Sequence, residues 1–410
     1  MKFSISALML IIFFSCNTPS DVEPEERNTF IKVFGSSLNS TGYSTSEVSD
    51  GYLIIGTALS DTLEYTTINK VDRNGNTQWS QLFVDSNGQD FIVLDDGYLI
   101  VGDSIERQGN DENVTKILLM KTDLQGNITA TATIGDLGDD PRDYHGVSLA
   151  KSDTDEIAVI GTRENEEDQD EMVLAGFDLN LNQNWVQYYS LDEGNYEVGK
   201  NIHYGADGRI AWVSTTVRYD EEDNNQVDAA SFSIPITFSN SENINNDSYG
   251  QNSTQQYFAT DVQPILSGYG VTGNTNENGN SDMFYIRVNR IGEINETSYQ
   301  LISNTLTGIE LRGNDEGNSL VGTSDGGVVL MGSISTTTEI GNGGKDIYLL
   351  KIDAQGNPIW ESIIGGSGDE VGYSIIQSSD GGFVITGKND FQGSAVALMI
   401  KTNNKGKLIE

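Results

Sequence analysis

Carboxylates are the side chains that offer the most chemistry in this sequence. The 410-residue chain holds 61 Asp and Glu residues against 23 Lys and Arg residues, a formal net charge of −38 at pH 7. Such a charge excludes nucleic acid as a partner, because phosphates repel it. Dense exposed carboxylates instead favour a basic partner or divalent cations, or they keep the protein soluble. Two runs are especially dense, and we interpret them as a partner-binding surface: Glu166, Glu167, Asp168, Asp170, Asp220, Glu221, Glu222 and Asp223.

Two polar segments have oxygen ligands at spacings that calcium accepts. Neither segment has the glutamate that closes an EF-hand loop, and polar β-turns have the same composition. We therefore expect no cofactor, with calcium as the one alternative. The candidate ligands are Asp85, Asn87 and Asp90 in the first segment, and Asn276, Asn278 and Asp282 in the second.

The histidines and the cysteine do not form a recognisable reactive set. His145 and His203 have neither the spacing of a metal pair nor that of a Ser/His/Asp set, so we expect each on the surface or between repeat units. Cys16 is the only cysteine. No pair of carboxylates stands out as an acid and a base for glycoside hydrolysis. We therefore predict no catalytic residues and a protein that is not an enzyme.

Two repeated signatures indicate the elements that carry these residues. The first is a polar turn, an apolar run and a glycine, as in Ser379–Gly387. The second is Lys-x-Asp-x-x-Gly, as in Lys351–Gly356. They define seven units of about 50 residues, a period typical of propellers and solenoids. Each unit has four short strand-like runs divided by turns, which predicts an all-β, seven-bladed β-propeller with four strands per blade. The copy near Phe232–Phe238 is the least regular.

The two ends of the chain complete one repeat. Phe30–Ser44 aligns without a gap with Trp360–Ser374, whereas the last copy of the second signature stops at Glu410. We therefore expect the N-terminal strand to close the last blade, which removes the exposed sheet edges. Trp79, Trp185 and Trp360 begin fourth strands and are expected to pack between blades, with Phe30 in the equivalent place.

The loops between second and third strands are long and dissimilar, whereas the turns on the opposite face are short and alike. Variable loops on a rigid scaffold are where binding usually occurs. The acidic runs lie in these loops, so we expect them on the functional face. The loops span Asp103–Asn113, Arg163–Glu171, Arg218–Asp228, Asn274–Asp282 and Ser333–Asp346.

The N-terminus has the composition of a secretory leader. Residues 1–15 are mostly apolar and too short to span a membrane, and a small residue precedes Cys16. Residues 16–28 are acidic and lack a hydrophobic pattern, as in a flexible tether. We predict a lipoprotein signal peptide over 1–15, lipidation of Cys16, a tether over 16–28 and the propeller over 29–410. An ordinary signal peptide is the alternative.

The repeat over Gly365–Gly387 resembles the propeller-type repeat of secreted and surface proteins of Bacteroidota, and the leader is similar to lipoprotein leaders of that group. The Asp-x-x-Gly-x-x-x-Trp run over Asp353–Trp360 is similar to the quinone-type repeat, which also occurs in non-catalytic outer-membrane assembly lipoproteins, and more distantly to the Asp-box of sialidases. The resemblance implies a lipid-anchored outer-membrane protein exposed at the cell surface.

Our leading functional prediction is a non-catalytic scaffold lipoprotein, an accessory subunit of an outer-membrane protein complex. One alternative is a surface glycan-binding lipoprotein, for which Tyr219 and Tyr269 are the candidate aromatic contacts. The other alternative is a propeller hydrolase or lyase.

Overall fold

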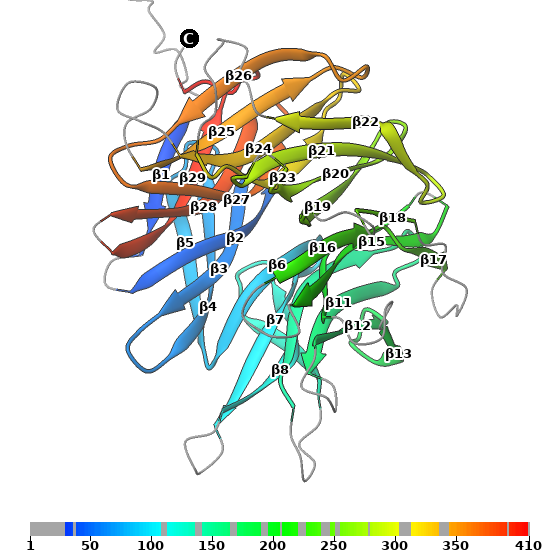
Figure 1. Ribbon diagram of the computed structural model, residues 1–410. Helices are drawn as coiled ribbons and strands as arrows, with labels where there is room; N and C mark the ends of the chain where they lie inside the picture. The colour runs from blue at the N-terminus through cyan, green and yellow to red at the C-terminus, as the bar shows by residue number, and fades with distance from the viewer. Residues whose placement is uncertain are drawn as a thin grey trace, which may run out of the picture.

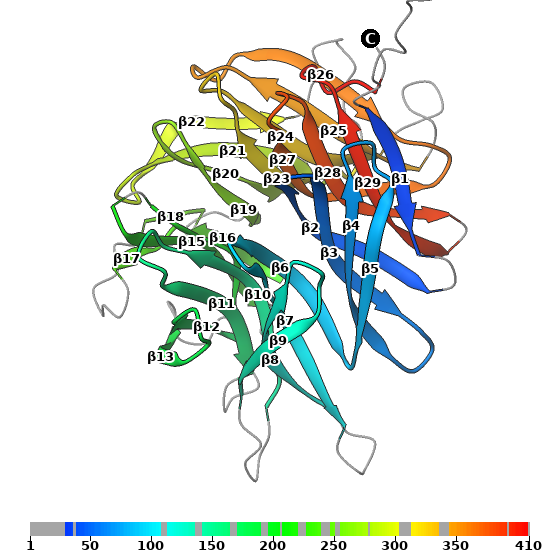
Figure 2. The same cartoon turned by 180° about the vertical axis from the view of Figure 1, so that it is seen from behind.

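Seven antiparallel sheets form a ring in the computed structural model of the protein (Figure 1), and Figure 2 shows the ring from behind. The prediction of an all-β, seven-bladed propeller is confirmed. Among the described residues there is no helix, and hence none that could cross a membrane. The structure describes residues 29–35, 38–107, 113–135, 142–164, 170–189, 196–205, 207–219, 227–238, 247–250, 255–277, 279–302, 313–335, 344–391 and 393–408. The predicted leader, tether and Cys16 lie outside them.

The strands of a blade follow one another outward from the axis of the ring. Blades 1 to 3 contain β2 Asn39–Val48, β3 Gly51–Leu59, β4 Glu64–Asp72 and β5 Thr77–Val84; β6 Ser86–Leu94, β7 Gly97–Arg107, β8 Asn113–Asp123 and β9 Ile128–Ile134; and β10 Tyr144–Lys151, β11 Ile157–Glu164, β12 Asp170–Phe177 and β13 Gln183–Tyr189. Blade 4 contains β14 Tyr196–Tyr204, β15 Arg209–Tyr219, β16 Val227–Ser233, β17 Ile236–Phe238 and β18 Ser248–Tyr249. Blades 5 to 7 contain β19 Tyr257–Ile265, β20 Gly268–Thr275, β21 Asp282–Asn289 and β22 Ile294–Ile302; β23 Glu316–Gly322, β24 Val328–Ser335, β25 Lys345–Ile352 and β26 Pro358–Ile364; and β27 Asp369–Gln377, β28 Phe383–Phe391, β29 Ser394–Thr402 and β1 Phe30–Phe34.

The N-terminal strand closes the ring as predicted. β1 pairs antiparallel with β29, with Phe30 opposite Lys401 and Phe34 opposite Ala397, and it lies beside that strand in both views. Ser40 strengthens the junction, because its hydroxyl donates to Phe34 O at 2.9 Å and accepts from Ala397 N at 2.9 Å. The outer edge of blade 7 is thus paired with a segment from the other end of the chain.

Aromatic side chains at the start of fourth strands pack between blades. The rings of Trp79 and Tyr98 are 6.3 Å apart, and those of Trp360 and Phe383 are 5.8 Å apart. Phe30 holds the equivalent place against Tyr52 at 6.3 Å. Trp185 contacts a buried cluster of blades 3 and 4. The interblade role predicted for these residues is confirmed, and each blade buries its faces against its neighbours.

The two sequence signatures are joined by an ion pair within a blade. The lysine of the third strand reaches the aspartate in the turn between the first two strands, as in Lys351–Asp325 at 2.7 Å and Lys401–Asp380 at 2.8 Å. Lys401 is 1% exposed, so its charge requires this partner. The repeat therefore preserves a lysine and an aspartate because each neutralises the other.

Blade 4 departs from the regular pattern because its third strand is divided. β15 pairs with β16 along one part and with β17 along another. Pro235 lies between the two segments, and proline has no N–H for a strand ladder. The fourth strand, β18, has two residues and pairs with β16. This irregularity explains why the signature over Phe232–Phe238 was hard to recognise.

Candidate functional site

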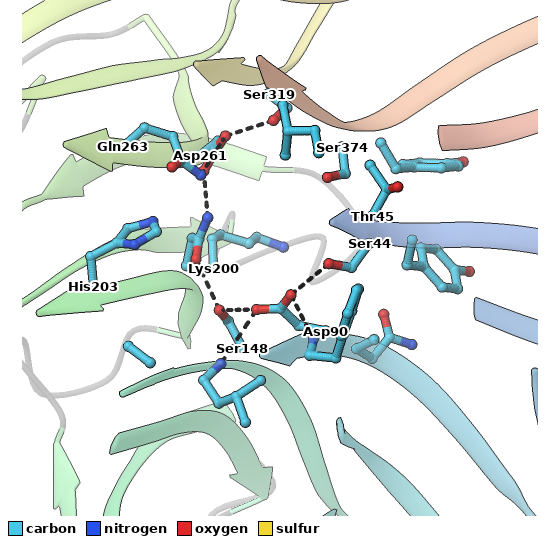
Figure 3. A pocket seen from close by; sticks show the side chains of 18 of the residues that line it. Ser44, Thr45, Asp90, Ser148, Lys200, His203, Asp261, Gln263, Ser319 and Ser374 are labelled. Carbon is cyan, nitrogen blue, oxygen red and sulfur yellow. Dashed lines mark hydrogen bonds between the residues drawn. The ribbon is translucent and has the colours of Figure 1, made fainter. Parts of the chain in front are cut away.

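A cavity of about 450 Å³ lies on the axis of the ring, and residues of all seven innermost strands line it (Figure 3). Hydroxyl and amide side chains make up much of the wall, including Thr45, Gln89 and Asn318. Tyr43 and Tyr373 pack against each other there, with ring centroids 5.3 Å apart. Hydroxyls, amides and aromatic faces together are suited to a polyhydroxylated ligand.

A β-bulge in each innermost strand turns one polar side chain toward its neighbours around the axis. A bulge adds one residue to a strand and re-aims the side chains that follow it. The residue that follows the bulge is polar in every blade, which produces a belt of polar groups. Its members are Ser44, Asp90, Ser148, Asn201, Asp261, Ser319 and Ser374.

Hydrogen bonds connect most of this polar belt (Figure 3). Asp90 accepts from Ser44 Oγ and Ser148 Oγ, each at 2.7 Å. Ser148 Oγ also lies 2.9 Å from Asn201 Oδ1, and Asn201 Nδ2 donates to Asp261 Oδ1 at 2.5 Å. The polar belt therefore ties blade to blade by direct side-chain contacts.

Asp261 is the most enclosed carboxylate of the polar belt. It is 3% exposed, and burial raises its pKa. Besides Asn201, it accepts from Ser319 Oγ at 2.8 Å, Leu320 N at 3.0 Å and Gln263 Nε2 at 3.2 Å. These donors oppose the effect of burial by stabilising the ionised form. Asp261 is thus committed to holding blades 4, 5 and 6 together.

His203 lines the same cavity but has a buried ring nitrogen (Figure 3). Burial lowers its pKa to about 4, so the imidazole is neutral at pH 7. Its Nε2 has no hydrogen-bond partner among the described residues. The sequence-based expectation was a surface or interblade histidine, whereas the structure locates His203 in the wall of the axial cavity.

His145 forms a carboxylate–histidine pair at the loop end of β10. Its Nδ1 lies 2.9 Å from Asp103 Oδ2, and the Asp103 side chain is 7% exposed. Asp103 also accepts from Gly146 N at 2.7 Å and Asn87 Nδ2 at 3.0 Å, which fixes its orientation. The bond to Asp103 raises the pKa of His145. A carboxylate that orients one ring nitrogen leaves the other for proton transfer.

Asp170 interacts electrostatically with His145 and with Lys200, which lines the cavity. Asp170 is half-buried, and burial raises its pKa, whereas His145 and Lys200 oppose that shift. Burial lowers the pKa of Lys200, which Asp170 opposes. The Lys200 side chain is exposed within the cavity, as Figure 3 shows, where surrounding protein still desolvates the ammonium group. We call Asp103, His145, Asp170 and Lys200 the axial cluster.

One of the eight residues of the predicted acidic surface lies within the described part of the chain. Asp170 is that residue: it is the first residue of β12, opposite Glu164, and it interacts electrostatically with His145 and Lys200. The side chain of Tyr219 lies outside the described part, and Tyr269 is 5% exposed. The members that lie outside the described residues are Glu166, Glu167, Asp168, Asp220, Glu221, Glu222 and Asp223.

The three calcium candidates of the first polar segment each bind a different protein group. Asp85 pairs with Arg107 at 2.8 Å, Asn87 bonds to Asp103, and Asp90 belongs to the polar belt. No group of three or more acidic, histidine or cysteine side chains in the described part of the chain is placed to hold a metal ion.

In the second segment, Asn276 Oδ1 accepts from Gln256 N at 2.8 Å, and Asp282 is 1% exposed and bonds to Asn280. Asn278 lies outside the described residues.

Sequence reasoning did not find Asp103, Lys200 or Asp261 as site residues. Each lies in a different blade, so spacing along the chain does not bring them together. One feature of the sequence could have indicated the polar belt. The polar residue at the middle of the innermost strand is Ser in most repeats, and it is replaced by Asp90, Asn201 and Asp261 in the other three.

No protein-family model matches the sequence, and no curated protein matches it. Several solved structures are similar to this chain. A Trypanosoma rangeli sialidase in complex with sialic acid is 10% identical with a TM-score of 0.46, over 82% of this chain and 56% of that chain. The subtype N10 neuraminidase-like protein from a little yellow-shouldered bat is 10% identical with a TM-score of 0.43, over 91% of this chain and 98% of its own. An exo-1,5-alpha-L-arabinanase from a bovine ruminal metagenomic library is 9% identical with a TM-score of 0.35, over 63% and 94%.

These comparisons correct our leading functional prediction. The chain spans about 56% of the length of the sialidase, and the identities are 9–11%. The prediction of a non-catalytic scaffold subunit was wrong, since the similar solved structures are sialidases and neuraminidase-like proteins.

Proposed function

We propose that this chain is a propeller hydrolase that cleaves a neutral glycan held in the axial cavity. The observation that carries the proposal is the axial cluster, in which the His145–Asp103 pair interacts electrostatically with Asp170, and Asp170 with Lys200, which lines the polar cavity. Groups with displaced pKa values gather at functional sites because catalysis requires them. Here burial and mutual charge interactions displace the pKa values of three of the four.

His145 and Asp170 take the two proton-transfer roles. The pKa of His145 is raised by Asp103, which keeps the imidazolium form available to protonate the leaving oxygen as the glycosidic C–O bond breaks. The pKa of Asp170 is raised by burial, which makes its carboxylate a stronger base. Asp170 removes a proton from water, whose oxygen forms the new bond to the anomeric carbon.

The cavity wall favours a neutral sugar. Its described lining contains hydroxyls, amides and three tyrosines, and its basic residues are the lysines Lys151 and Lys200, with no arginine. A sugar carboxylate is best held by the planar fork of a guanidinium group. Uncharged hydroxyl groups, in contrast, are matched by side chains such as Gln89, Thr260 and Asn318, which both donate and accept.

A second candidate function is glycan binding without cleavage. The observation that favours it is the polar belt, where Asp90 and Asp261 are both engaged by protein donors. These two carboxylates line the cavity but have their hydrogen-bonding capacity largely used within the protein. In this case the cavity provides recognition alone. For either function, we propose that lipidated Cys16 holds the ring at the outer surface of the outer membrane.

The test measures binding and cleavage on the same panel of neutral polysaccharides. We expect release of reducing ends by the wild type and a loss of at least about 100-fold in Asp170→Asn and His145→Gln, with binding retained. Asp61→Asn, an exposed carboxylate outside the cavity, is the matched control and should act as wild type. The rate should rise with pH through the raised pKa of Asp170 and fall through the raised pKa of His145.

Binding without release of reducing ends, abolished by Gln89→Ala, would identify the second candidate instead. Neither binding nor cleavage on any neutral glycan would overturn both. Cleavage that survives in Asp170→Asn and His145→Gln would remove these residues from the mechanism.

A further inference from the structure

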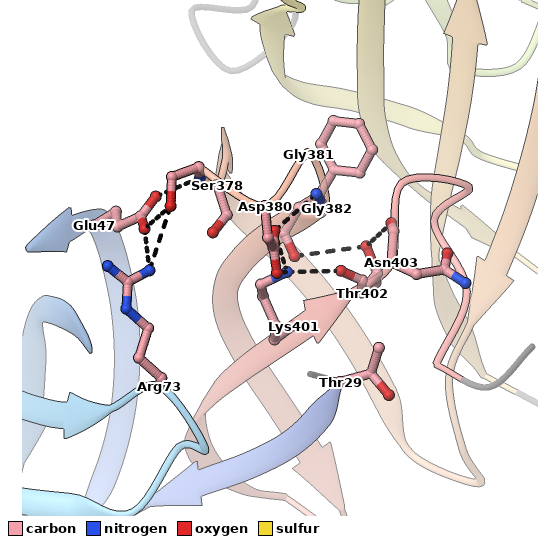
Figure 4. Close-up of polar contacts among 12 residues, drawn as sticks. Thr29, Glu47, Arg73, Ser378, Asp380, Gly381, Gly382, Lys401, Thr402 and Asn403 are labelled. Carbon is pink, nitrogen blue, oxygen red and sulfur yellow. Dashed lines mark hydrogen bonds and ion pairs between the residues drawn. The ribbon is translucent and has the colours of Figure 1, made fainter. Parts of the chain in front are cut away.

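The boundary between blades 7 and 1 is closed by a network around Arg73 (Figure 4). Arg73 lies in the turn between β4 and β5, forms an ion pair with Glu47 and lies 5.8 Å from the centre of the Tyr52 ring. Glu47 also accepts from the N and Oγ of Ser379 in blade 7, each at 2.6 Å. The Tyr52 hydroxyl lies 3.2 Å from Ser378 Oγ. A carboxylate thus occupies the space between an arginine and the turn of the preceding blade.

Blade 5 repeats the arginine and the tyrosine of this network. Arg290 follows Asn289 in a turn closed by Gly292 N to Asn289 O at 3.2 Å, as Arg73 follows Asp72 in a turn closed by Gly75 N to Asp72 O at 3.0 Å. Both closing glycines have positive φ, 92° and 76°. Tyr269 is the second residue of β20, as Tyr52 is the second residue of β3.

The carboxylate is missing from this repeat. In blade 1, Glu47 is the residue of β2 that pairs with Tyr52. In blade 5, the residue of β19 that pairs with Tyr269 is Pro264. Blade 4, which precedes blade 5, also lacks the hydroxyl that Ser378 provides beside Tyr52, because Gly205 holds the equivalent place. The backbone oxygen of each residue accepts from the N–H of the glycine three residues later, at 2.9 Å for Gly205 and 2.8 Å for Ser378.

A cavity of about 390 Å³ lies at this boundary, on the face opposite the long loops, and this volume falls in the range of small-molecule sites. Its lining includes Tyr204, Asp207, Pro264, Tyr269 and Arg290. Asp207 is neutralised by Arg209, with an Oδ2 to Nη2 distance of 2.5 Å. Arg290 is exposed, and its contact in the described part of the chain is a neutral acceptor, Leu266 O at 3.3 Å. The charge without a counter-ion here is therefore positive, in a protein with a net charge of −38.

We propose that the cavity between blades 4 and 5 binds a small molecule through a carboxylate, which pairs with Arg290 in the place that Glu47 holds at Arg73. A guanidinium group binds a carboxylate through two parallel hydrogen bonds, which gives both affinity and orientation. The rings of Tyr204 and Tyr269 and the side chain of Ile265 line the space for the body of the ligand. The site is separate from the axial cavity and does not depend on the proposed hydrolase function.

The experiment titrates the full protein with glutarate and, as a neutral control of similar shape, with glutaramide. Binding is followed by calorimetry and by the side-chain N–H signals of arginine in NMR spectra. We expect glutarate to bind and to shift one arginine signal, and glutaramide to bind at least about tenfold more weakly. A third ligand, acetylated glutamate amide, carries the same carboxylate on a peptide backbone. If it binds more tightly than glutarate, the carboxylate that occupies the site in nature belongs to a protein side chain. If glutarate binds more tightly, it belongs to a free acid.

Two variants and one matched control decide the outcome. Arg290→Gln removes the charge, and Pro264→Glu supplies the carboxylate that blade 1 already has, so each should weaken glutarate binding at least about tenfold. Arg73→Gln, at the equivalent position of blade 1, should leave binding unchanged because Arg73 is already paired. Melting temperatures of all variants verify folding, and Pro264→Glu tests the site even if Arg290→Gln is unstable. Equal binding of glutaramide, or unchanged affinity in either variant, overturns the proposal.

Discussion

At the scale of single residues, surroundings rather than residue type decide what a carboxylate does. Asp261 is enclosed by four donors and acts as a junction between blades. Asp170 has a raised pKa and is close to two ionisable side chains. Asp325 is exposed and pairs with a buried lysine, which lowers its pKa to about 2. Among so many acidic residues, composition alone does not separate these roles.

The first prediction concerns the polar belt. Asp261→Asn should destabilise the protein by about 1–3 kcal/mol, because the amide nitrogen would face groups that now donate to the carboxylate. Ser374→Ala is the matched control, since Ser374 lies in the same belt without a described hydrogen bond, and it should change stability by less than about 0.5 kcal/mol. Urea unfolding of both variants measures the difference. Equal effects would show that the belt does not hold the blades together.

The second prediction concerns the ion pair of Lys351 and Asp325. Because the pKa of Asp325 is lowered from 3.8 to about 2 in the folded state, its stabilising effect is present above pH 3.8 and is lost as pH falls toward 2. The Asp325 side chain is 64% exposed, so we expect about 1 kcal/mol between wild type and Asp325→Asn at pH 6. Unfolding measured across this pH range should show the difference vanish. For Asp95→Asn, at an exposed turn, the difference in stability from wild type should not change with pH.

At the scale of elements, the strand that closes the ring matters more than its length suggests. β1 has five residues, yet it covers the edge of β29 and places Phe30 against Tyr52 of blade 1. An uncovered edge exposes a row of backbone groups that pairs readily with other chains. The divided third strand of blade 4 shows the opposite case, where Pro235 interrupts a ladder and the outer strand is reduced to two residues.

The third prediction tests this closure. Deletion of residues 29–35 should lower the melting temperature by several degrees and promote aggregation, measured by calorimetry and light scattering. Phe30→Ala should cost about 2 kcal/mol because its ring is lost from the blade interface, whereas Ile31→Ala, whose side chain is 50% exposed, should cost little. A deletion variant that melts within a degree or two of the parent would contradict the closed ring.

At the scale of the whole molecule, the ring provides two distinct faces and one axis. The long loops and the axial cluster lie at one end, and the short turns and the cavity beside Arg290 lie at the other. An anchored ring would present these ends differently to the surrounding medium. The predicted anchor is Cys16, and the acidic segment after it is the predicted tether.

The fourth prediction tests the anchor. Cys16→Ser should prevent acylation and move the protein from the membrane fraction to the soluble fraction, because several acyl chains hold a protein firmly at a bilayer. Metabolic labelling with a fatty-acid analogue and cell fractionation measure both effects. Ser15→Ala keeps a small residue before the cysteine and should preserve membrane retention. Labelling that persists in Cys16→Ser would disprove lipidation at this residue.

The sequence by itself determined the architecture of this protein. The repeat period, the turn glycines and the match between Phe30–Ser44 and Trp360–Ser374 are local patterns, and each depends on contacts that recur in every blade. Packing of Trp79, Trp360 and Phe30 between blades followed from their repeated position. Repeats of this kind specify a fold because each unit buries the same surface against the next.

Only the tertiary structure decided where chemistry can occur. Asp103 and His145 belong to neighbouring blades and pair because β7 and β10 lie side by side in the ring, and Lys200 of a third blade interacts electrostatically with Asp170. Asp90 and Asp261 each accept a hydrogen bond from a side chain of an adjacent blade, Ser44 and Asn201 respectively. Pro264 lines the cavity beside Arg290 at the register position that Glu47 holds in blade 1, and this correspondence is visible only once the strand register is known. Non-local convergence leaves no fixed spacing along a chain, and this is why sequence reasoning found the ring but not its sites.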